Sequence, residues 1–320
     1  MATNEPVESA EHKSPDRSGV LRLQIVSDLH LEQLDRSKPE WKHLLVRPVF
    51  DIIAVLGDTC ELQHEEMWVD FTRYLSSNWK TVILVNGNHE YHCSDFVKSQ
   101  PRTDGHTMEE DDDIRRGGIQ AKTIKSLKAR QKYLIKQHFS NVHLLDNSDL
   151  IMNAPDGRRI RIVGTTLWSY IPYVNYAKVQ RDIRDYSRVF VESDVGGDPV
   201  LATPQDTTLL HQDAVRYLYD AIVDHSHENT EVVVLTHHAP LKTNTSDPQY
   251  ERDRDRACNA AFSSEQSSLM KPNVRLWAFG HTHWHADFMF RDTRIYSNPR
   301  GYGDHDPALR TYRPDMILEI

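Results

Sequence analysis

The chain has 320 residues, of which 38 are Lys or Arg and 47 are Asp or Glu, so its formal charge is -9 at pH 7. This acidity opposes the binding of a long polyanion, and we expect no nucleic-acid partner. A hydrophobic share of 38% and a charged share of 27% are typical of a folded globular protein. No run of about 18 apolar residues occurs, which excludes a membrane-spanning helix. We therefore expect a cytoplasmic protein with no membrane partner.

The chain opens with a polar stretch and continues as one predicted domain. Residues 1–19 contain no apolar segment and predict a disordered tail, whereas 20–320 predict a single α/β domain. Within the domain, short β-rich runs alternate with helical patterns. The β-rich runs are 20–28, 49–58, 81–88, 159–168, 231–240, 274–283, 286–290, 293–297 and 316–320. Apolar positions at helical spacing predict covering helices at 119–139 and 206–224.

Three segments follow neither pattern. Residues 98–118 carry an EEDDD run without apolar periodicity and predict a mobile insertion. Residues 153–159, NAPDGRR, contain Pro, Asp and Gly and predict the tip of a hairpin. Residues 168–205 are aromatic and contain Pro, and we expect them to form a cap loop over a site.

The residues that indicate chemistry lie where apolar runs end, in the segments SDLH, LGDT, GNHE, THHAP and GHTH. Each segment alone is common, because Gly-Asp and Asn are turn formers and a lone His usually has a structural role. Their repeated position at strand ends predicts that the loops converge, since binding sites are normally built at such sheet edges. The candidate residues are Asp28, His30, Asp58, Asn88, His89, His237, His281 and His283.

This set of side chains predicts a metal centre. Carboxylate oxygen with imidazole nitrogen is the ligand set of Mn, Fe, Zn, Ni or Co rather than of Ca. The cysteines, Cys60, Cys93 and Cys258, form no CxxC pair, which argues against a thiolate zinc site and a disulfide framework. On extended backbone, the two-residue spacing in DLH and HTH directs both polar side chains of each pair to one side. The candidates are too many for one cation, so we predict two divalent cations about 3.5–4 Å apart with a shared carboxylate.

In their order, the five segments resemble the motifs DxH, GD, GNH[DE], a His before Pro, and GHxH of the calcineurin-like metallophosphoesterases. The resemblance runs from about residue 20 to beyond Arg300. It implies a four-layer αββα sandwich, in which two mixed β-sheets are flanked by helices and the active site lies on loops at strand ends. It also implies a hydrolase of phosphate esters, similar to compact single-domain bacterial and fungal members.

The resemblance assigns a role to each candidate residue. The first metal would be held by Asp28, His30, Asp58 and His283, and the second by Asp58, Asn88, His237 and His281, with Asp58 as the bridge. His89 would be the catalytic residue beside the phosphate, oriented by Glu90. His238 and Arg300, the latter in the segment NPRGY, would meet the substrate.

The implied reaction is hydrolysis by a water activated between the metals, with Mn favoured in vitro and no covalent enzyme intermediate. The sequence contains neither GxSxG nor GxxxxGK[ST], so it gives no support to a serine hydrolase or a P-loop protein. We expect a phosphodiesterase or phosphomonoesterase acting on a small molecule such as a nucleotide, with no obligate protein partner. The alternatives are a serine/threonine protein phosphatase and a non-catalytic scaffold of this fold. Every expected motif position is filled, which disfavours the scaffold.

Overall fold

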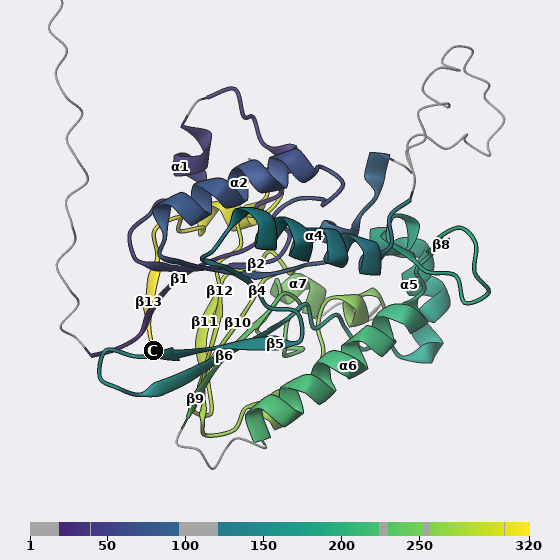
Figure 1. Cartoon of the computed structure of the whole chain (residues 1–320). Coiled ribbons are helices and arrows are strands. Elements are labelled where there is room, and N and C mark those ends of the chain that lie inside the picture. Colours follow the sequence, from purple (N-terminus) through teal and green to yellow (C-terminus); the bar gives the residue numbers. More distant parts are fainter. Residues whose placement is uncertain (1–18, 39, 96–120, 224–229, 252–256, 304) are drawn as a thin grey trace, which may run out of the picture.

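The computed structural model describes residues 19–38, 40–95, 121–223, 230–251, 257–303 and 305–320. The insertion predicted at 98–118, and all of the predicted tail except Gly19, lie outside these ranges. Two β-sheets lie face to face, with helices on their outer faces (Figure 1). The predicted αββα sandwich with two mixed sheets is confirmed.

The first sheet has five strands in the order β13-β1-β2-β3-β4. Strands β1 to β4 are parallel to their neighbours, and β13 pairs antiparallel with β1 at the edge. Because β1, β2 and β3 are parallel neighbours, their carboxyl ends meet at one edge of the sheet. The bounds are β1 Arg22–Val26, β2 Ile52–Leu56, β3 Thr81–Val85, β4 Val142–Leu144 and β13 Ile317–Glu319.

The second sheet has six strands in the order β11-β12-β10-β9-β6-β5. The four central strands are parallel, and β11 and β5 pair antiparallel at the two edges. Strands β5 and β6 form a hairpin, and Ala154 and Arg158 are hydrogen-bonded across its tip, as NAPDGRR predicted. The bounds are β5 Ser148–Asn153, β6 Arg159–Thr165, β9 Glu231–Thr236, β10 Val274–Phe279, β11 Ala286–Phe290 and β12 Thr293–Ser297.

The space between the sheets is a continuous apolar core. Ile25, Leu56 and Ile83 point into it from the first sheet, and Val233 and Leu276 meet them from the second. All five are buried. Since a sheet covered on both faces needs apolar residues at successive positions, the unbroken apolar runs in the sequence match this architecture. The core fixes the two sheets relative to each other, and with them the loops at their carboxyl ends.

Helices cover both outer faces. Helices α2 (Glu65–Asn78) and α4 (Ile124–His138) lie on the first sheet, and α6 (Pro204–Val223) lies on the second (Figure 1). The latter two correspond to the predicted helices at 119–139 and 206–224, although 119 and 120 are not described. The remaining α-helices of the described residues are short: α1 Trp41–Leu45, α5 Tyr176–Asp182 and α7 Pro248–Glu251. Among the described residues, no helix has the length and apolar character needed to cross a membrane.

Helix α2 was not identified from the sequence, although its pattern is regular. Its buried residues are Trp68, Phe71, Thr72 and Leu75, which follow the helical spacing i, i+3, i+4 and i+7. Two glutamates occupy its first turn, where they interact favourably with the helix dipole. The polar Thr72 on the buried face weakened the apolar pattern.

The segment 168–205 contains short elements instead of an irregular loop. It includes α5 and the two-stranded ribbon of β7 (Phe190–Val191) and β8 (Val200–Leu201). A 3-10 turn over Arg184–Ser187 follows α5 and carries Asp185, whose side chain is buried. Through this turn the segment contacts the loops described next, while its role as a cap stays a prediction.

Candidate metal centre

The five motif segments lie in loops at the carboxyl ends of parallel strands. Strands β1, β2 and β3 of the first sheet end at Val26, Leu56 and Val85, and β9 and β10 of the second end at Thr236 and Phe279. Each strand is shorter than its predicted run, because the chain leaves the extended conformation just before the polar residues. The paired sheets thus bring the five loops to one edge of the molecule.

The loops turn through left-handed backbone. Asp28, His30, His281 and His283 have φ values of 54°, 45°, 69° and 50°, and Asp58 has a φ of 51°. The prediction that DLH and HTH act as extended segments was therefore wrong, although each pair does face one site. Left-handed conformations are uncommon outside glycine and cost free energy, so the surrounding contacts hold these residues in place.

Two glycines allow the loops to approach closely. Gly57 has a φ of +82°, and a Cβ on it would collide with the ring of His237. A Cβ on Gly87 would collide with the carboxylate of Asp58. The glycines of LGDT and GNHE are thus required because other loops pack directly on their Cα atoms.

The first half of the cluster consists of Asp28, His30 and His283. The Nε2 atoms of His30 and His283 lie 3.3 Å apart, and His283 Nε2 lies 3.5 Å from Asp28 Oδ1. His30 Nε2 lies 3.9 Å from Asp58 Oδ2. Potential ligand atoms of these three residues all lie within 4.8 Å of one another, as a shared cation requires.

The second half consists of Asn88, His237 and His281. His237 Nε2 lies 3.1 Å from Asn88 Oδ1 and 3.3 Å from Asp58 Oδ1. Asp58 therefore faces both halves, with one carboxylate oxygen toward His30 and the other toward His237. This is the position in which a carboxylate bridges two cations.

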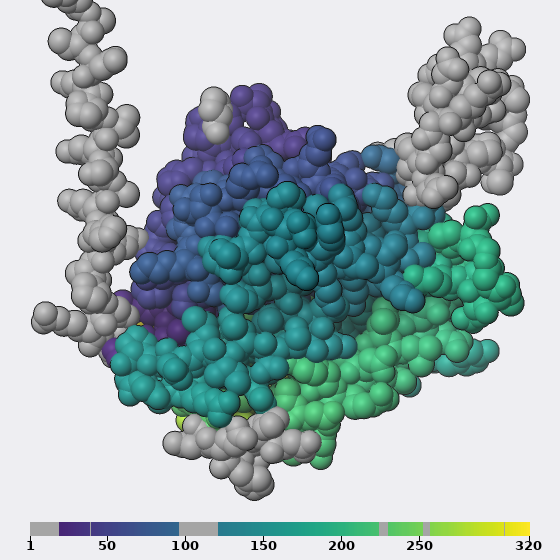
Figure 2. Space-filling model, in the orientation of Figure 1, coloured from purple at the N-terminus to yellow at the C-terminus, as the bar shows by residue number. Residues whose placement is uncertain are grey.

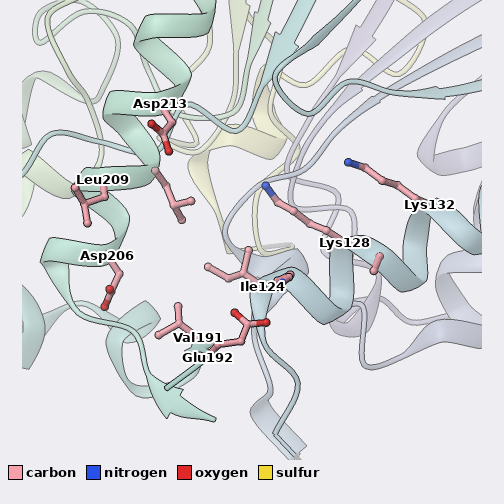
Figure 3. Close-up of a pocket in the computed structure, with 11 residues that line it drawn as sticks. Ile124, Lys128, Lys132, Val191, Glu192, Asp206, Leu209 and Asp213 are labelled. Carbon is pink, nitrogen blue, oxygen red and sulfur yellow. The ribbon is translucent and has the colours of Figure 1, made fainter. Parts of the chain in front are cut away.

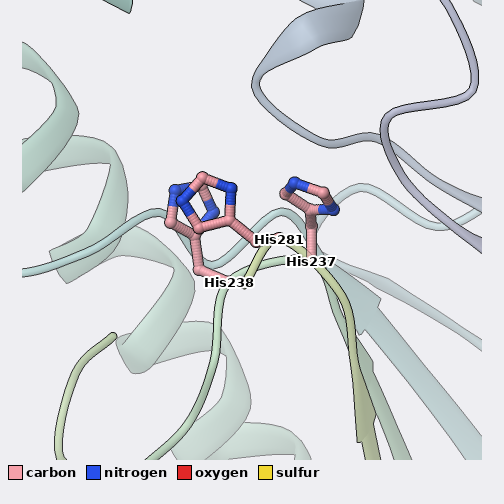
Figure 4. A group of neighbouring side chains, drawn as sticks. All are labelled: His237, His238 and His281. Carbon is pink, nitrogen blue, oxygen red and sulfur yellow. The ribbon is translucent and has the colours of Figure 1, made fainter. Parts of the chain in front are cut away.

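His238 lies closer to the cluster than the sequence suggested. His237, His238 and His281 form a group with ligand nitrogens within 4.8 Å, and the rings of His238 and His281 lie near each other with His237 to one side (Figure 4). The ring centroids of His238 and His281 are 4.0 Å apart. Phe262 stacks on the ring of His281, with centroids 5.0 Å apart. His238 is buried, so its expected contact with substrate would need access past these rings.

Two histidines are oriented through their outer nitrogens. His237 Nδ1 lies 2.8 Å from the carbonyl oxygen of Leu56, and His283 Nδ1 lies 2.6 Å from Asp306 Oδ2. Because both acceptors lack hydrogens, each Nδ1 donates, and the neutral ring then has a free lone pair on Nε2. Both Nε2 atoms face the cluster, which is the arrangement of metal-binding histidines with a fixed tautomer.

Asp185 orients Asn88 in the same way. Its Oδ1 accepts hydrogen bonds from Asn88 Nδ2 and from His92 Nε2, each at 2.8 Å. With the amide nitrogen of Asn88 held by Asp185, the amide oxygen faces His237 and the cluster. The His92 ring also packs on His89, with centroids 4.2 Å apart, so Asp185 supports two neighbouring side chains.

Glu90 does not orient the His89 ring as expected. Its buried carboxylate accepts hydrogen bonds from the backbone N–H groups of Asp58, Thr59 and Gly87, at 2.7 to 2.8 Å. Burial and the nearby Asp58 raise the pKa of Glu90 to about 7, although the amides and His237 oppose this. Glu90 therefore fastens the GNHE loop to the LGDT loop through their backbones.

The charges of the cluster fit divalent cations. Asp28 and Asp58 are buried, and among the described residues neither pairs with a Lys or Arg side chain. Burial lowers the pKa of His237 and His283, but the carboxylates outweigh it: Asp58 and Asp28 raise the pKa of His237 to about 9, and Asp28 and Asp306 raise that of His283 to about 10. The carboxylates thus stabilise a positive charge near the Nε2 atoms, and a bound metal ion would supply that charge.

His89 and Tyr302 meet beside the cluster. The backbone N–H of His89 donates to Asp58 Oδ1 at 2.9 Å, and its ring lies 4.7 Å from that of His30. Burial lowers the pKa of His89 well below its usual value, although Asp58 opposes this. Tyr302 Oη lies 3.3 Å from His89 Nε2. His89 thus lies beside His30 and Asp58, with a ligand nitrogen within 4.8 Å of theirs, and its role toward the substrate stays a prediction.

Arg300 lies in the loop after β12, whose backbone is fixed to the DLH loop. Its N–H donates to the Ser27 carbonyl, and its Nη1 donates to Gly301 O at 3.2 Å. Its charge also acts on the half-buried Tyr312, where it opposes the rise of the pKa caused by burial. These contacts direct the guanidinium along its own loop, so a role in substrate binding stays a prediction.

A groove of about 510 Å³ lies away from the cluster, between α4 and α6, which share one face of the molecule (Figure 2). Its walls carry lysines from α4 and carboxylates from α6 (Figure 3). Lys128 and Lys132 already pair with Asp146, at 2.6 and 3.3 Å. No predicted site residue lines the groove, so we place the chemistry at the cluster, where the titratable groups converge.

Three site residues were missed from the sequence: Asp185, Tyr302 and Asp306. Asp185 begins the segment DYSRV and Tyr302 ends the segment NPRGY, but no spacing rule distinguishes either residue within its segment. Asp306 precedes a proline and resembles an ordinary turn or cap residue, and it does accept from Ala308 N. Each is recognised only by the side chain it touches.

Comparisons with known proteins agree with this geometry. The family model described as calcineurin-like phosphoesterase matches residues 21–285. The uncharacterized protein L509 of Acanthamoeba polyphaga mimivirus is 25% identical over 302 residues, covering 91% of this chain and 94% of L509. The crystal structure of phosphopantetheinyl hydrolase from Mycobacterium tuberculosis has a TM-score of 0.59 at 16% identity, covering 94% of this chain and 96% of that one. The structural likeness concerns the fold.

Proposed function

We propose, since this chain belongs to the calcineurin-like phosphoesterase family, that it hydrolyses a phosphate ester of a small molecule such as a nucleotide. The chain is a metallophosphoesterase. The members of this family are dinuclear metal-dependent hydrolases, and the His and Asp clusters of this chain fit metal binding. The observation that carries the proposal is the shared orientation of His237, His283 and Asn88. Each has its outer polar atom anchored, so that its ligand atom faces Asp58 or Asp28.

In this proposal the two halves hold one cation each. The first half with Asp58 would hold the first cation, and the second half with Asp58 would hold the second. When bound, the cations supply Lewis-acid stabilisation of phosphoryl oxygens and lower the pKa of a water that attacks phosphorus in line. Imidazole-rich sites favour Mn, Fe, Zn, Ni or Co over Mg, and we propose Mn for assays in vitro.

The side chains around the cluster would fix the cations and meet the ester. Asp58 and Asp28 balance the charge of the cations, and the Asp185 and Asp306 carboxylates keep the ligands in one orientation. His89 lies beside His30 and Asp58, where it could give a hydrogen bond or a proton to the ester as negative charge develops. The site needs no covalent intermediate on the enzyme.

The decisive experiment measures metal-dependent hydrolysis with a range of substrates. Chelation should abolish hydrolysis of bis(p-nitrophenyl) phosphate or p-nitrophenyl phosphate, and Mn, Ni or Co should restore it better than Mg. Full activity after prolonged incubation in excess EDTA would reject the metal assignment. A panel of nucleotides, other small esters and a phosphoserine peptide then identifies the substrate class. Preference for the peptide over every small ester would favour a protein phosphatase instead.

A further inference from the structure

Tyr302 covers the first half of the cluster at its open side. Its ring centroid lies 4.4 Å from those of His30 and His283. The residue nevertheless exposes 43% of its surface. One face of the ring therefore packs on two predicted metal ligands, while the rest of the side chain meets solvent at the mouth of the site.

The backbone around Tyr302 is fixed to the cluster on both sides. Gly301 N donates to the carbonyl oxygen of Asp28 at 3.0 Å, and Tyr302 N donates to Asp306 Oδ2 at 3.0 Å. Gly301 has a φ of +81°, and a Cβ on it would collide with the Asp306 carboxylate. The same carboxylate orients His283, so the position of Tyr302 is coupled to that of a predicted ligand.

The hydroxyl of Tyr302 is available to a substrate oxygen. Within the described part of the chain its hydrogen-bond partner is His89 Nε2, at 3.3 Å. A phenol keeps its hydrogen near neutral pH, because its ordinary pKa is about 10. With the His89 proton on Nε2, the ring donates to Tyr302 Oη and the phenolic hydrogen remains free to be donated onward.

We propose that Tyr302 is a further catalytic residue, whose hydroxyl acts with His89 to bind the leaving-group oxygen of the phosphate ester. The proposal rests on the proposed function. As the bond between phosphorus and the leaving oxygen breaks, negative charge collects on that oxygen, and a hydrogen bond from the phenol becomes stronger. No bond within Tyr302 is made or broken, and the ring keeps its packing on His30 and His283.

Removal of the hydroxyl alone tests this role. Tyr302→Phe keeps the ring and its contacts, and Tyr173→Phe, at a residue 86% exposed, is the matched control. Both variants of the full chain are loaded with Mn and assayed on two esters of the type that the wild type hydrolyses. One ester has p-nitrophenol as its leaving group and the other has an alkyl alcohol, which depends more on stabilisation of its oxygen.

The expected result is a loss of about tenfold in kcat for the alkyl ester in Tyr302→Phe, as for one lost hydrogen bond. The nitrophenyl ester should change much less, the metal content should stay at the wild-type level, and Tyr173→Phe should match the wild type. Unchanged kcat on both esters, or an equal loss on both, would overturn the leaving-group role. Loss of metal from Tyr302→Phe would also overturn it, since the phenol would then support the ligands. If the Mn-loaded wild type hydrolyses no phosphate ester, the proposed function fails instead.

Discussion

The two halves of the metal cluster are equally buried, each with two buried residues and one partly exposed histidine, and they differ in the ring that covers them. In the first half the side chain of His283 is 14% exposed, and the Tyr302 above it is open to solvent. In the second half His281 is likewise partly exposed, and the half-buried Phe262 stacks on it. The rim of the site therefore carries a phenol over the first half and an apolar ring over the second.

The two halves are alike in one respect. In each, a carboxylate outside the cluster is hydrogen-bonded to a predicted metal ligand. Asp306 holds His283 and two backbone N–H groups in the first half, and Asp185 holds Asn88 and His92 in the second. Such outer hydrogen bonds commonly contribute a factor of about 10–100 to metal affinity. The halves therefore differ in the ring that covers them and agree in the way that their ligands are fixed.

The largest effect is expected at Asp58, which belongs to neither half. Asp58→Asn removes the shared charge, and we expect both metals and activity to be lost together. Loss of Lewis-acid contacts worth several kcal/mol should lower kcat/KM by about three orders of magnitude. Metal analysis and steady-state kinetics check this, with the exposed Asp51→Asn as the control. Two metals per chain and normal turnover in Asp58→Asn would show that the bridge assignment is wrong.

The next effect is expected at His89, which lies beside His30 and the shared Asp58. His89→Asn should lower kcat by about 10²–10⁴-fold, because an interaction strongest in the transition state is removed. Both metals should remain bound, and the loss should be greater for an alkyl leaving group than for p-nitrophenolate. His43→Asn on α1 is the exposed control. A metal missing from His89→Asn would mean that His89 is a ligand, and an unchanged kcat would reject its catalytic role.

Variants of Asp185 and Asp306 test whether the two halves bind separate cations. Asp185→Ala should weaken only the second metal, and Asp306→Ala only the first, each by about 10–100-fold. Stepwise metal titration followed by calorimetry measures the two affinities, and Asp213→Ala on the exposed face of α6 serves as the control. Equal weakening of both metals in either variant would show that the two halves do not bind separate cations.

The smallest effect is expected outside both halves, at Asp146. Burial raises the pKa of Asp146, but Lys128 and Lys132 lower it more, so the net pKa lies below its usual value. A lowered folded-state pKa stabilises the protein above the unfolded pKa of about 4, and this contribution is lost as the pH falls through the folded pKa. Asp146→Asn should cost about 1 kcal/mol at pH 7 and less near pH 3, with metal content unchanged. Urea unfolding at both pH values tests this, and a larger effect at pH 3 would contradict it.

The elements that the sequence predicted well are those with strong local signals. Helix α6 begins at Pro204, and Thr203 and Asp206 cap it reciprocally through side-chain hydrogen bonds to backbone N–H groups. The central strands carry unbroken apolar runs, such as VVVL in β9. By contrast, β4 has three residues, of which only Val142 is buried, and so gives no clear pattern. Such short elements form only because neighbouring elements supply hydrogen bonds and shield them from solvent.

The sequence by itself determined the strand runs and the candidate ligands, because both depend on residue type and order along the chain, whereas the two-sheet architecture was implied by the resemblance of the ordered motifs to a known family. Buried parallel strands need apolar runs, and ligand atoms can come only from side chains such as Asp58 and His237. Only the tertiary structure decided which atom of each ligand faces the cluster and what holds it there. Asp185 reaches Asn88 across 97 positions of the sequence, and Asp306 reaches His283 from a separate loop. Such contacts leave no local pattern, because a hydrogen bond needs only proximity and direction, which the packing of the two sheets provides.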